Sequence, residues 1–272
     1  MTETREPHPA LRPFVSRVWA SAGSAFQPRG RERVLPTGAM HLAIRVSGEP
    51  LRVFDGSADR RGTALGAAVV GGARDVPYIR AVSPVTSVGA QLRPGAAQLL
   101  FGVPAVELAD RHTPLDALWS SPAVERLHDQ LAEARTADAR LRWLEATLLA
   151  RLPSLRGLHP AVAHALRRFQ QSDDVGDVVA QTGYSHRRFI ELFKRAVGLG
   201  PKRYCGVMRF QRALDLMSRA DTRSLSQTAL SAGYADQPHF AREFRRLAGQ
   251  TATSYRSQSP AARHHVPLSR TS

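Results

Sequence analysis

Residues 183–204 read GYSHRRFIELFKRAVGLGPKRY, and residues 233–256 read GYADQPHFAREFRRLAGQTATSYR. The second stretch repeats the first, beginning with a Gly-Tyr pair that recurs 50 residues later. After one inserted residue the offset is 51, and it relates Phe189, Phe193, Arg195, Gly198 and Tyr204 to Phe240, Phe244, Arg246, Gly249 and Tyr255. Matches that stay in register through a single one-residue shift indicate a duplicated structural unit.

The first copy has the pattern of a helix-turn-helix unit: a short helix, a turn that contains glycine, and a second helix. Gly183 is expected in the turn, and Ser185 is expected to cap the second helix. Apolar residues at helical spacing predict the buried side of the two helices, namely Val175, Val178, Val179, Phe189, Leu192, Phe193 and Ala196.

The second copy carries the same pattern with different capping residues. Ser224 and Gln227 form an S-x-x-Q capping box, Asp236 takes the capping role of Ser185, and Pro238 sits in the first helical turn, where its missing N–H costs little. The predicted inward residues are Leu225, Ala229, Leu230, Phe240, Phe244 and Leu247.

The outward residues of each second helix are candidates for DNA contact, because a recognition helix presents its N-terminal part to the major groove. Arginine reads guanine, glutamine can read adenine, glutamate accepts from cytosine, and an aliphatic side chain meets the thymine methyl. The predicted base contacts are Arg187, Ile190, Glu191, Gln237, His239 and Arg242. The predicted contacts to the DNA backbone are His186, Arg188, Lys194, Arg245 and Arg246.

Residues 201–219 between the copies predict one helix of about 18 residues, roughly 27 Å long. Its apolar side carries Tyr204, Val207, Phe210, Leu214 and Met217. Four arginines lie off that side and either contact phosphates or face solvent: Arg203, Arg209, Arg212 and Arg219.

These two stretches, with RFQRAL at 209–214, resemble the arabinose-operon regulator family (AraC/XylS type). The resemblance covers about the last hundred folded residues. It implies two recognition helices in successive major grooves, with the six base contacts named above at the matching positions. It also implies RNA polymerase as a partner, with activation as the commoner behaviour. The chain departs from the family pattern at Gly200 and Ala252, where Ser or Thr and Pro are usual.

The N-terminal part predicts a small β-rich domain over residues 1–121. Apolar residues alternate from Met40 to Val46 and from Val88 to Leu92. The segment 88–119 also resembles the end of the N-terminal domain of some members of that family, where such domains bind small effectors, form dimers, or both. The fold class expected for the whole chain is therefore α+β: a β-rich regulatory domain followed by an all-α DNA-binding domain.

Residues 122–157 predict a helical segment and an interdomain linker. Its leucine stripe, from Leu141 to Leu152, either packs on the protein's own sheet or contributes to a homodimer interface. The tandem helix-turn-helix domain is expected over 158–256. The tail over 257–272 is expected to be disordered, because it lacks apolar periodicity.

The distribution of charged residues along the chain indicates the kind of partner that the protein binds. Of the formal net charge of +15, residues 158–272 carry +10 (18 basic against 8 acidic) and residues 1–157 carry +5 (20 against 15). This distribution favours double-stranded DNA as a partner. The chain starts without a signal-peptide pattern and has no membrane-spanning apolar run, so we expect a cytoplasmic, nucleoid-associated protein.

We expect neither an enzyme nor a cofactor or metal site. His8, His41, His112 and His128 are scattered along the sequence without a ligand or nucleophile motif. Two alternatives are weighed against a sequence-specific regulator. A DNA-alkylation repair protein with the same reader domain needs a reactive cysteine, and Cys205 is the only cysteine. A nonspecific basic nucleic-acid-binding protein would use the charge alone.

Overall fold

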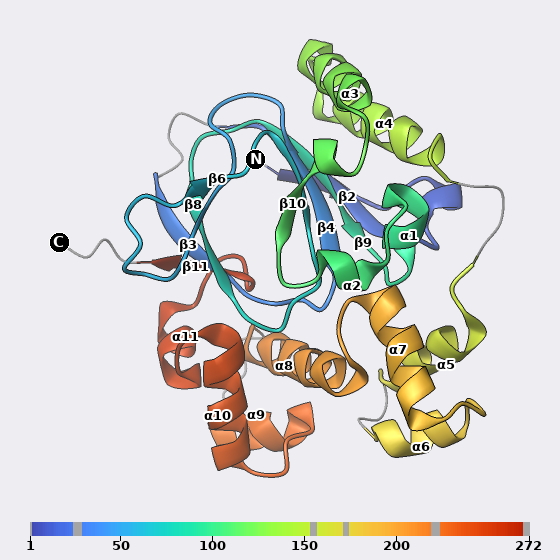
Figure 1. Ribbon diagram of the computed structural model, residues 1–272. Coiled ribbons are helices and arrows are strands. Elements are labelled where there is room, and N and C mark those ends of the chain that lie inside the picture. The colour runs from blue at the N-terminus through green and yellow to red at the C-terminus, as the bar shows by residue number, and fades with distance from the viewer. Residues whose placement is uncertain (1, 24–28, 153–156, 171–173, 219–223, 269–272) are drawn as a thin grey trace.

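The computed structural model describes residues 2–23, 29–152, 157–170, 174–218 and 224–268. They form a β-rich N-terminal domain, a pair of helices beside it, and a helical C-terminal domain, as the sequence predicted (Figure 1). Among these residues no helix is long and apolar enough to cross a membrane.

Two sheets face each other in the N-terminal domain. The six-stranded sheet runs in the order β1 (Thr2–Arg5), β2 (Val15–Ser21), β9 (Ser87–Leu92), β4 (Met40–Arg45), β7 (Ala68–Gly71) and β10 (His112–Pro114). The five-stranded sheet runs in the order β11 (His265–Leu268), β3 (Gly30–Val34), β8 (Tyr78–Val82), β5 (Arg52–Phe54) and β6 (Thr63–Ala64). All the strand pairs are antiparallel.

The alternation predicted in β4 and β9 determines where the apolar core lies. Leu42 and Ile44 point to one side of the six-stranded sheet together with Val88 and Ala90, and all four are essentially inaccessible to solvent. Helices cover that side of the sheet, and their bounds are α1 (Ala96–Phe101), α2 (Ala105–Leu108), α3 (Ser121–Glu133) and α4 (Ala137–Leu149). Two short 3₁₀ helices accompany them, η1 (Pro9–Leu11) and η2 (Leu115–Ala117).

The predicted leucine stripe packs on the protein's own sheet. Leu141, Leu144 and Leu148 are completely buried, and α4 contacts β2 and β9. The helical pattern is interrupted after α3, and Thr136 caps the second helix by accepting a hydrogen bond from the Ala139 N–H at 3.1 Å.

The C-terminal domain consists of α5 (Pro160–Arg168), α6 (Val175–Ala180), α7 (His186–Val197), α8 (Pro201–Ser218), α9 (Leu225–Ala232), α10 (Gln237–Ala248) and α11 (Ala252–Gln258). The predicted caps form: Ser185 caps α7, Ser224 and Gln227 form the capping box of α9, and Asp236 caps α10. Residues 153–156 of the predicted interdomain linker lie outside the described residues.

One predicted core residue is wrong. Leu230 is 62% exposed on α9, and Thr228 is buried in its place, with its hydroxyl donating to the carbonyl oxygen of Ser224 at 3.0 Å. The internal hydrogen bond satisfies the buried hydroxyl, so a polar residue can occupy the core position.

The tail differs from the disordered segment that we expected over 257–272. Helix α11 extends to Gln258, and β11 pairs with β3, with Val266 opposite Arg33 and completely buried. Residues 269–272 lie outside the described part of the chain. A four-residue edge strand that contains a proline carries too little periodicity to be predicted, although an edge strand tolerates proline.

Candidate nucleic-acid interface

Helix α7 presents its first turns to solvent. The Ser185 side chain accepts a hydrogen bond from the Arg188 N–H at 3.4 Å and so begins the helix. The Arg187 side chain is 93% exposed, Glu191 is exposed and lies within 3.5 Å of the Arg187 guanidinium, and Ile190 is half-buried. The three predicted base contacts of the first unit therefore lie together on one helical face.

The opposite face and the C-terminal end of α7 are fixed by packing. Phe189 and Phe193 are completely buried, and Phe193 meets the Tyr204 ring edge to face at 5.6 Å. At its C-terminal end, the Ala196 carbonyl accepts a hydrogen bond from the Gly95 N–H of the β-rich domain at 2.8 Å. The helix is thus held at one end while its other end stays open.

Helix α10 repeats this arrangement. Asp236 accepts from the His239 N–H at 2.6 Å, and Gln237 and Arg242 are exposed. His239 is half-buried because its ring packs against Tyr234 at 5.4 Å. A groove of about 370 Å³ runs between α10 and the start of α11, lined by residues that include Gln237, Arg242, Arg245 and Thr251.

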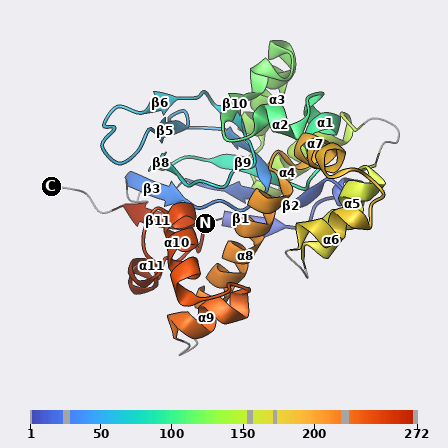
Figure 2. The ribbon, with the colours of Figure 1, turned by 60° about the horizontal axis from the view of Figure 1, so that its bottom comes forward.

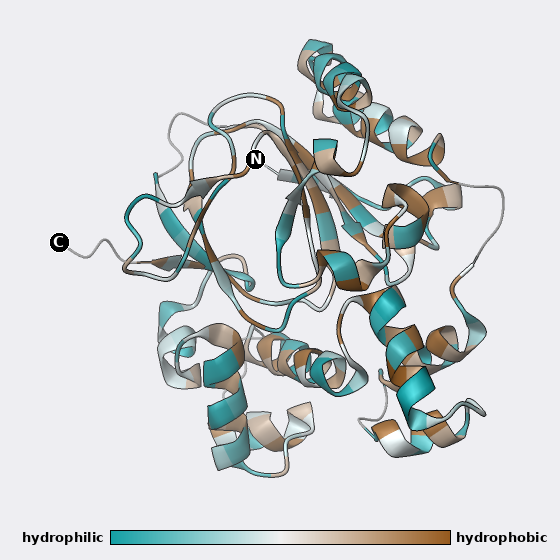
Figure 3. Cartoon of the chain, in the orientation of Figure 1, coloured by the Kyte–Doolittle hydropathy of each residue, from teal (hydrophilic) through white to brown (hydrophobic). Residues whose placement is uncertain are grey.

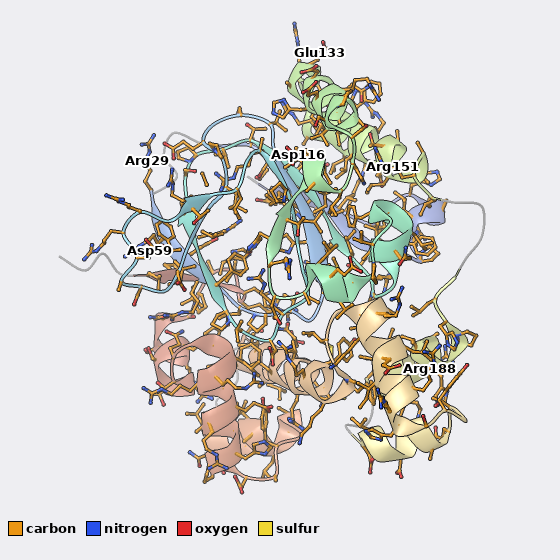
Figure 4. The ribbon with its side chains drawn as sticks, in the orientation of Figure 1. Arg29, Asp59, Asp116, Glu133, Arg151 and Arg188 are labelled. Carbon is orange, nitrogen blue, oxygen red and sulfur yellow. The ribbon has the colours of Figure 1, made fainter. Side chains whose placement is uncertain are left out.

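Four of the five predicted backbone contacts lie at the surface, and one of them, Arg188, is 3.6 Å from the Glu191 carboxylate. His186, Arg188, Lys194 and Arg245 are exposed, and Arg188 is labelled on α7 in Figure 4. The hydropathy colouring shows α7 and α10 as largely hydrophilic on the outside (Figure 3). The fifth, Arg246, is bound to the Asp75 carboxylate of the β-rich domain at 2.8 Å.

Helix α8 lies between α7 and α10 in both views (Figures 1 and 2). We expected its arginines either to contact phosphates or to face solvent, but the three described ones make contacts within the protein. Arg203 binds Asp75 and Asp110, Arg209 binds Glu243 at 3.0 Å, and Arg212 donates to the Ala232 carbonyl at 3.2 Å. Arg219 lies outside the described residues. The described arginines of α8 therefore fix the helix to its neighbours.

Asp75 joins the two domains. Its carboxylate is bound by Arg203 of α8 and by Arg246 of α10, and the residue is 5% exposed. Burial raises the pKa of this carboxyl, but hydrogen bonds from the two arginines more than offset that effect and leave the pKa below its usual range. We call these three residues the Asp75 latch.

A second contact between the domains depends on a glycine. Gly198 adopts φ +89° at the end of α7, and a Cβ there would lie 3.1 Å from the Ala105 carbonyl oxygen. A side chain at this position would therefore combine backbone strain with a crowded contact.

The sequence reasoning missed a polar cluster between the two sheets. The rings of His41 and His112, treated as scattered, lie 6.0 Å apart, and the His112 ring lies 4.5 Å from that of Tyr78 on the opposite sheet. Burial, aided by the charge of Arg74, lowers the pKa of His41 to about 3 and that of His112 to about 2. No spacing in the sequence signals this cluster, because its members come from β4, β8 and β10.

The described residues contain no group of three or more His, Cys, Asp or Glu side chains placed to hold a metal. Cys205 is buried in α8, 3% exposed, among core residues. A buried thiol in a helix core does not meet the requirement of the repair-protein alternative for a reactive cysteine.

Comparison with known families gives two matches. A helix-turn-helix domain family matches residues 178–258, and a domain family of unknown function (DUF6597) matches residues 3–114. No curated protein matches the chain.

Among solved structures, the chain is similar to ToxT from Vibrio cholerae, at 8% identity and TM-score 0.45, over 96% of this chain and 99% of that one. An AraC-type DNA-binding domain-containing regulator from Chromobacterium violaceum is 27% identical, with TM-score 0.33, over 38% of this chain and 94% of that one. The DNA-binding domain of AdpA, solved with a target DNA, is 27% identical, with TM-score 0.32, over 36% of this chain and 86% of that one.

Proposed function

We propose that the chain is a DNA-binding transcription regulator with an AraC-type helix-turn-helix domain, and that it reads a specific duplex sequence with α7 and α10 in successive major grooves. The observation that carries the proposal is the matching orientation of the two helices. Each begins at a capped, solvent-exposed N-terminus and ends against the β-rich domain.

The length of α8 supports a two-groove arrangement. An 18-residue helix spans roughly 27 Å, and successive major grooves on one side of a duplex are about 34 Å apart. The remaining distance is of the order of the width of one α-helix. Two units joined by this strut can therefore address one stretch of DNA.

The proposed base readers divide between the units. Arg187, Ile190 and Glu191 read the first groove, and Gln237, His239 and Arg242 read the second. In this scheme, Glu191 exchanges its 3.5 Å contact with Arg187 for a cytosine amino group, which releases Arg187 to a guanine. Lys194 and Arg245 fix the register through phosphates.

Selection from a pool of randomised duplexes tests the proposal. The wild-type chain is expected to enrich a site with two half-sites about one helical turn apart. Arg187→Ala should relax the preference at one or two base pairs of one half-site, and Arg242→Ala should do so in the other. The exposed Arg126 of α3 gives a matched control: Arg126→Ala should select the wild-type site. Unchanged selection by both test variants refutes the assigned readers.

A competition assay separates this function from nonspecific binding through charge. A sequence reader should prefer the enriched duplex over bulk DNA by about 10³ or more at fixed salt. A protein that binds through its charge alone should show no such preference.

We also propose that the β-rich domain regulates the reader by binding a small effector. The Asp75 latch and the hydrogen bond from Gly95 to Ala196 support this role, since any shift of the β-rich domain reaches both recognition helices. Dimerisation through this domain is the alternative form of regulation, and sedimentation of the full chain with and without its selected duplex tests it.

A further inference from the structure

The inference that follows rests on the proposed regulatory role of the β-rich domain and concerns what that domain binds. Arg74 lies in the connection between β7 and β8. The Arg74 side chain turns toward the space between the sheets and stacks over the Tyr78 ring, 4.5 Å from its centroid. The residue is only 7% exposed.

Arg74 has no carboxylate partner among the described residues. The carboxylate of Asp110, which acts on Arg74 electrostatically, is bound by Arg203 at 3.0 Å. The neighbouring Arg80 is compensated, because its Nε donates to Glu32 at 2.6 Å. One buried positive charge is therefore left over in the cluster, and a buried charge without a counter-charge is costly.

Two hydrogen-bond donors of the cluster also lack an acceptor. The Nη2 of Arg74 lies 3.4 Å from Nδ1 of His112, and a guanidinium only donates, so Nδ1 accepts and the proton of His112 is on Nε2. That Nε2 and the Nε of Arg74 are both buried without a hydrogen-bond partner among the described residues. Two buried donors therefore face no acceptor, a rare condition in native proteins.

The same cluster remains in reach of solvent. His41, His112 and Tyr78 are only half-buried, although they lie between the two sheets. The His41 ring packs directly over Gly71, where a Cβ would overlap it. The surroundings of Arg74 are thus polar and short of negative charge.

We propose that Arg74 and His112 bind the oxyanion group of a small organic acid, a carboxylate or a phosphate, between the two sheets. The planar guanidinium offers paired donors that match such an oxyanion, and the Nε2–H of His112 supplies another. The ligand provides the missing negative charge and the missing acceptors at once.

The next residue along the chain, Asp75, connects the proposed site to the DNA-binding domain. The Arg74 side chain contacts His112 inside the β-rich domain, whereas the Asp75 side chain binds Arg203 and Arg246 of the C-terminal domain. An anion that repositions Arg74 moves the backbone of the residue that holds the DNA-binding domain. Occupancy of the site therefore changes the strength of the Asp75 latch.

Calorimetric titration of the full-length protein with sodium benzoate tests the site. Inorganic phosphate forms a second arm, benzamide is the neutral control, and ionic strength is held constant with chloride. Benzoate or phosphate is expected to bind saturably, and benzamide is not. Arg74→Met should weaken anion binding by about tenfold or more, while Arg61→Met, which removes an exposed arginine of the same domain, should leave it unchanged. If neither anion binds saturably, or if both variants bind like the wild type, the proposal is wrong.

Thermal melting without added anion separates ligand binding from a structural role. Removing an unpaired buried cation should raise the Tm of Arg74→Met or leave it unchanged, whereas loss of a structural contact would lower it well below the wild type and overturn the proposal. The bound anion should also shift the affinity of the wild-type protein for its selected duplex, but not that of Arg74→Met. Site selection by Arg74→Met should match the wild type, so failure of this inference is distinguishable from failure of the DNA-reading proposal.

Discussion

The Nη1 atom of Arg246 lies 2.8 Å from Oδ2 of Asp75, 171 positions earlier in the chain. Arg246 belongs to the recognition helix of the second unit, and Asp75 belongs to the β-rich domain. A residue expected to contact a phosphate is thus already bound to a carboxylate. A phosphate contact by Arg246, as predicted from the sequence, would therefore have to replace its contact with the β-rich domain.

Breaking the Asp75 latch should strengthen DNA binding. Asp75→Asn removes the negative charge that holds Arg246 and that shares Arg203 with Asp110, and each arginine released to a phosphate should add about 0.9 to the slope of log affinity against log salt. Titrations of a labelled duplex at several salt concentrations measure this slope. Asp116→Asn removes an exposed acidic side chain of the same domain and is the matched control. An unchanged slope for Asp75→Asn would show that the latch does not withhold these arginines from DNA.

The buried phenylalanines should determine the stability of each helix-turn-helix unit. Phe193→Ala and Phe244→Ala each remove a completely buried ring, at an expected cost of about 3 to 5 kcal/mol in the free energy of unfolding. Leu230→Ala, at a position that is 62% exposed, should change it by less than about 0.5 kcal/mol. Urea denaturation measures all three variants. Native-like stability of both phenylalanine variants would contradict the assigned core.

Stability should fall as the pH drops below about 6.5. His41 and His112 stay neutral in the folded protein because their pKa values are lowered to about 3 and about 2, whereas in the unfolded chain they take up protons near 6.5. The unfolded state therefore binds more protons between those values, and each histidine costs up to about 1.4 kcal/mol per pH unit.

Denaturant titrations at pH 7 and pH 5 test this dependence. His41→Gln should lose less stability between the two values than the wild type. His186→Gln, which removes an exposed histidine at the start of α7, should lose as much as the wild type. Equal losses for all three proteins would mean that His41 is not held neutral by the fold.

The strand β11 should stabilise the N-terminal domain. Deleting residues 262–272 removes the pairing with β3, the buried Val266, and the contact of His265 with Glu32 at 2.9 Å. Burial of a valine side chain alone is worth about 1.5 to 3 kcal/mol. Calorimetry should therefore show a lower Tm for this deletion, whereas deleting only 269–272 leaves β11 in place and should preserve it.

The helix-turn-helix units could be predicted because each of their signals is local. The caps at Ser185 and Asp236 and the phenylalanine spacing in α7 and α10 lie within a dozen residues of one another, and the structure confirms them. The base and phosphate contacts remain predictions, although all six predicted base readers lie on exposed or half-buried helical faces.

Three features could not be predicted because they depend on residues distant in the sequence. The partner of Arg246 lies in another domain. The strand that pairs with β11 lies more than 200 residues earlier in the chain. The lack of hydrogen-bond acceptors around Arg74 and His112 can be seen only in the folded protein. Leu230 was misassigned for a different reason, since a hydrogen-bonded threonine replaced it in the core.

The strand order of the five-stranded sheet has a consequence for how the protein is made. Strand β3 emerges from the ribosome early, but its neighbour β11 is translated only after the whole DNA-binding domain. Since domains tend to fold as they are synthesised, the edge of β3 stays unpaired until the reader has been produced. A chain that lacks β11 therefore displays an open strand edge, which can pair with a strand of another chain.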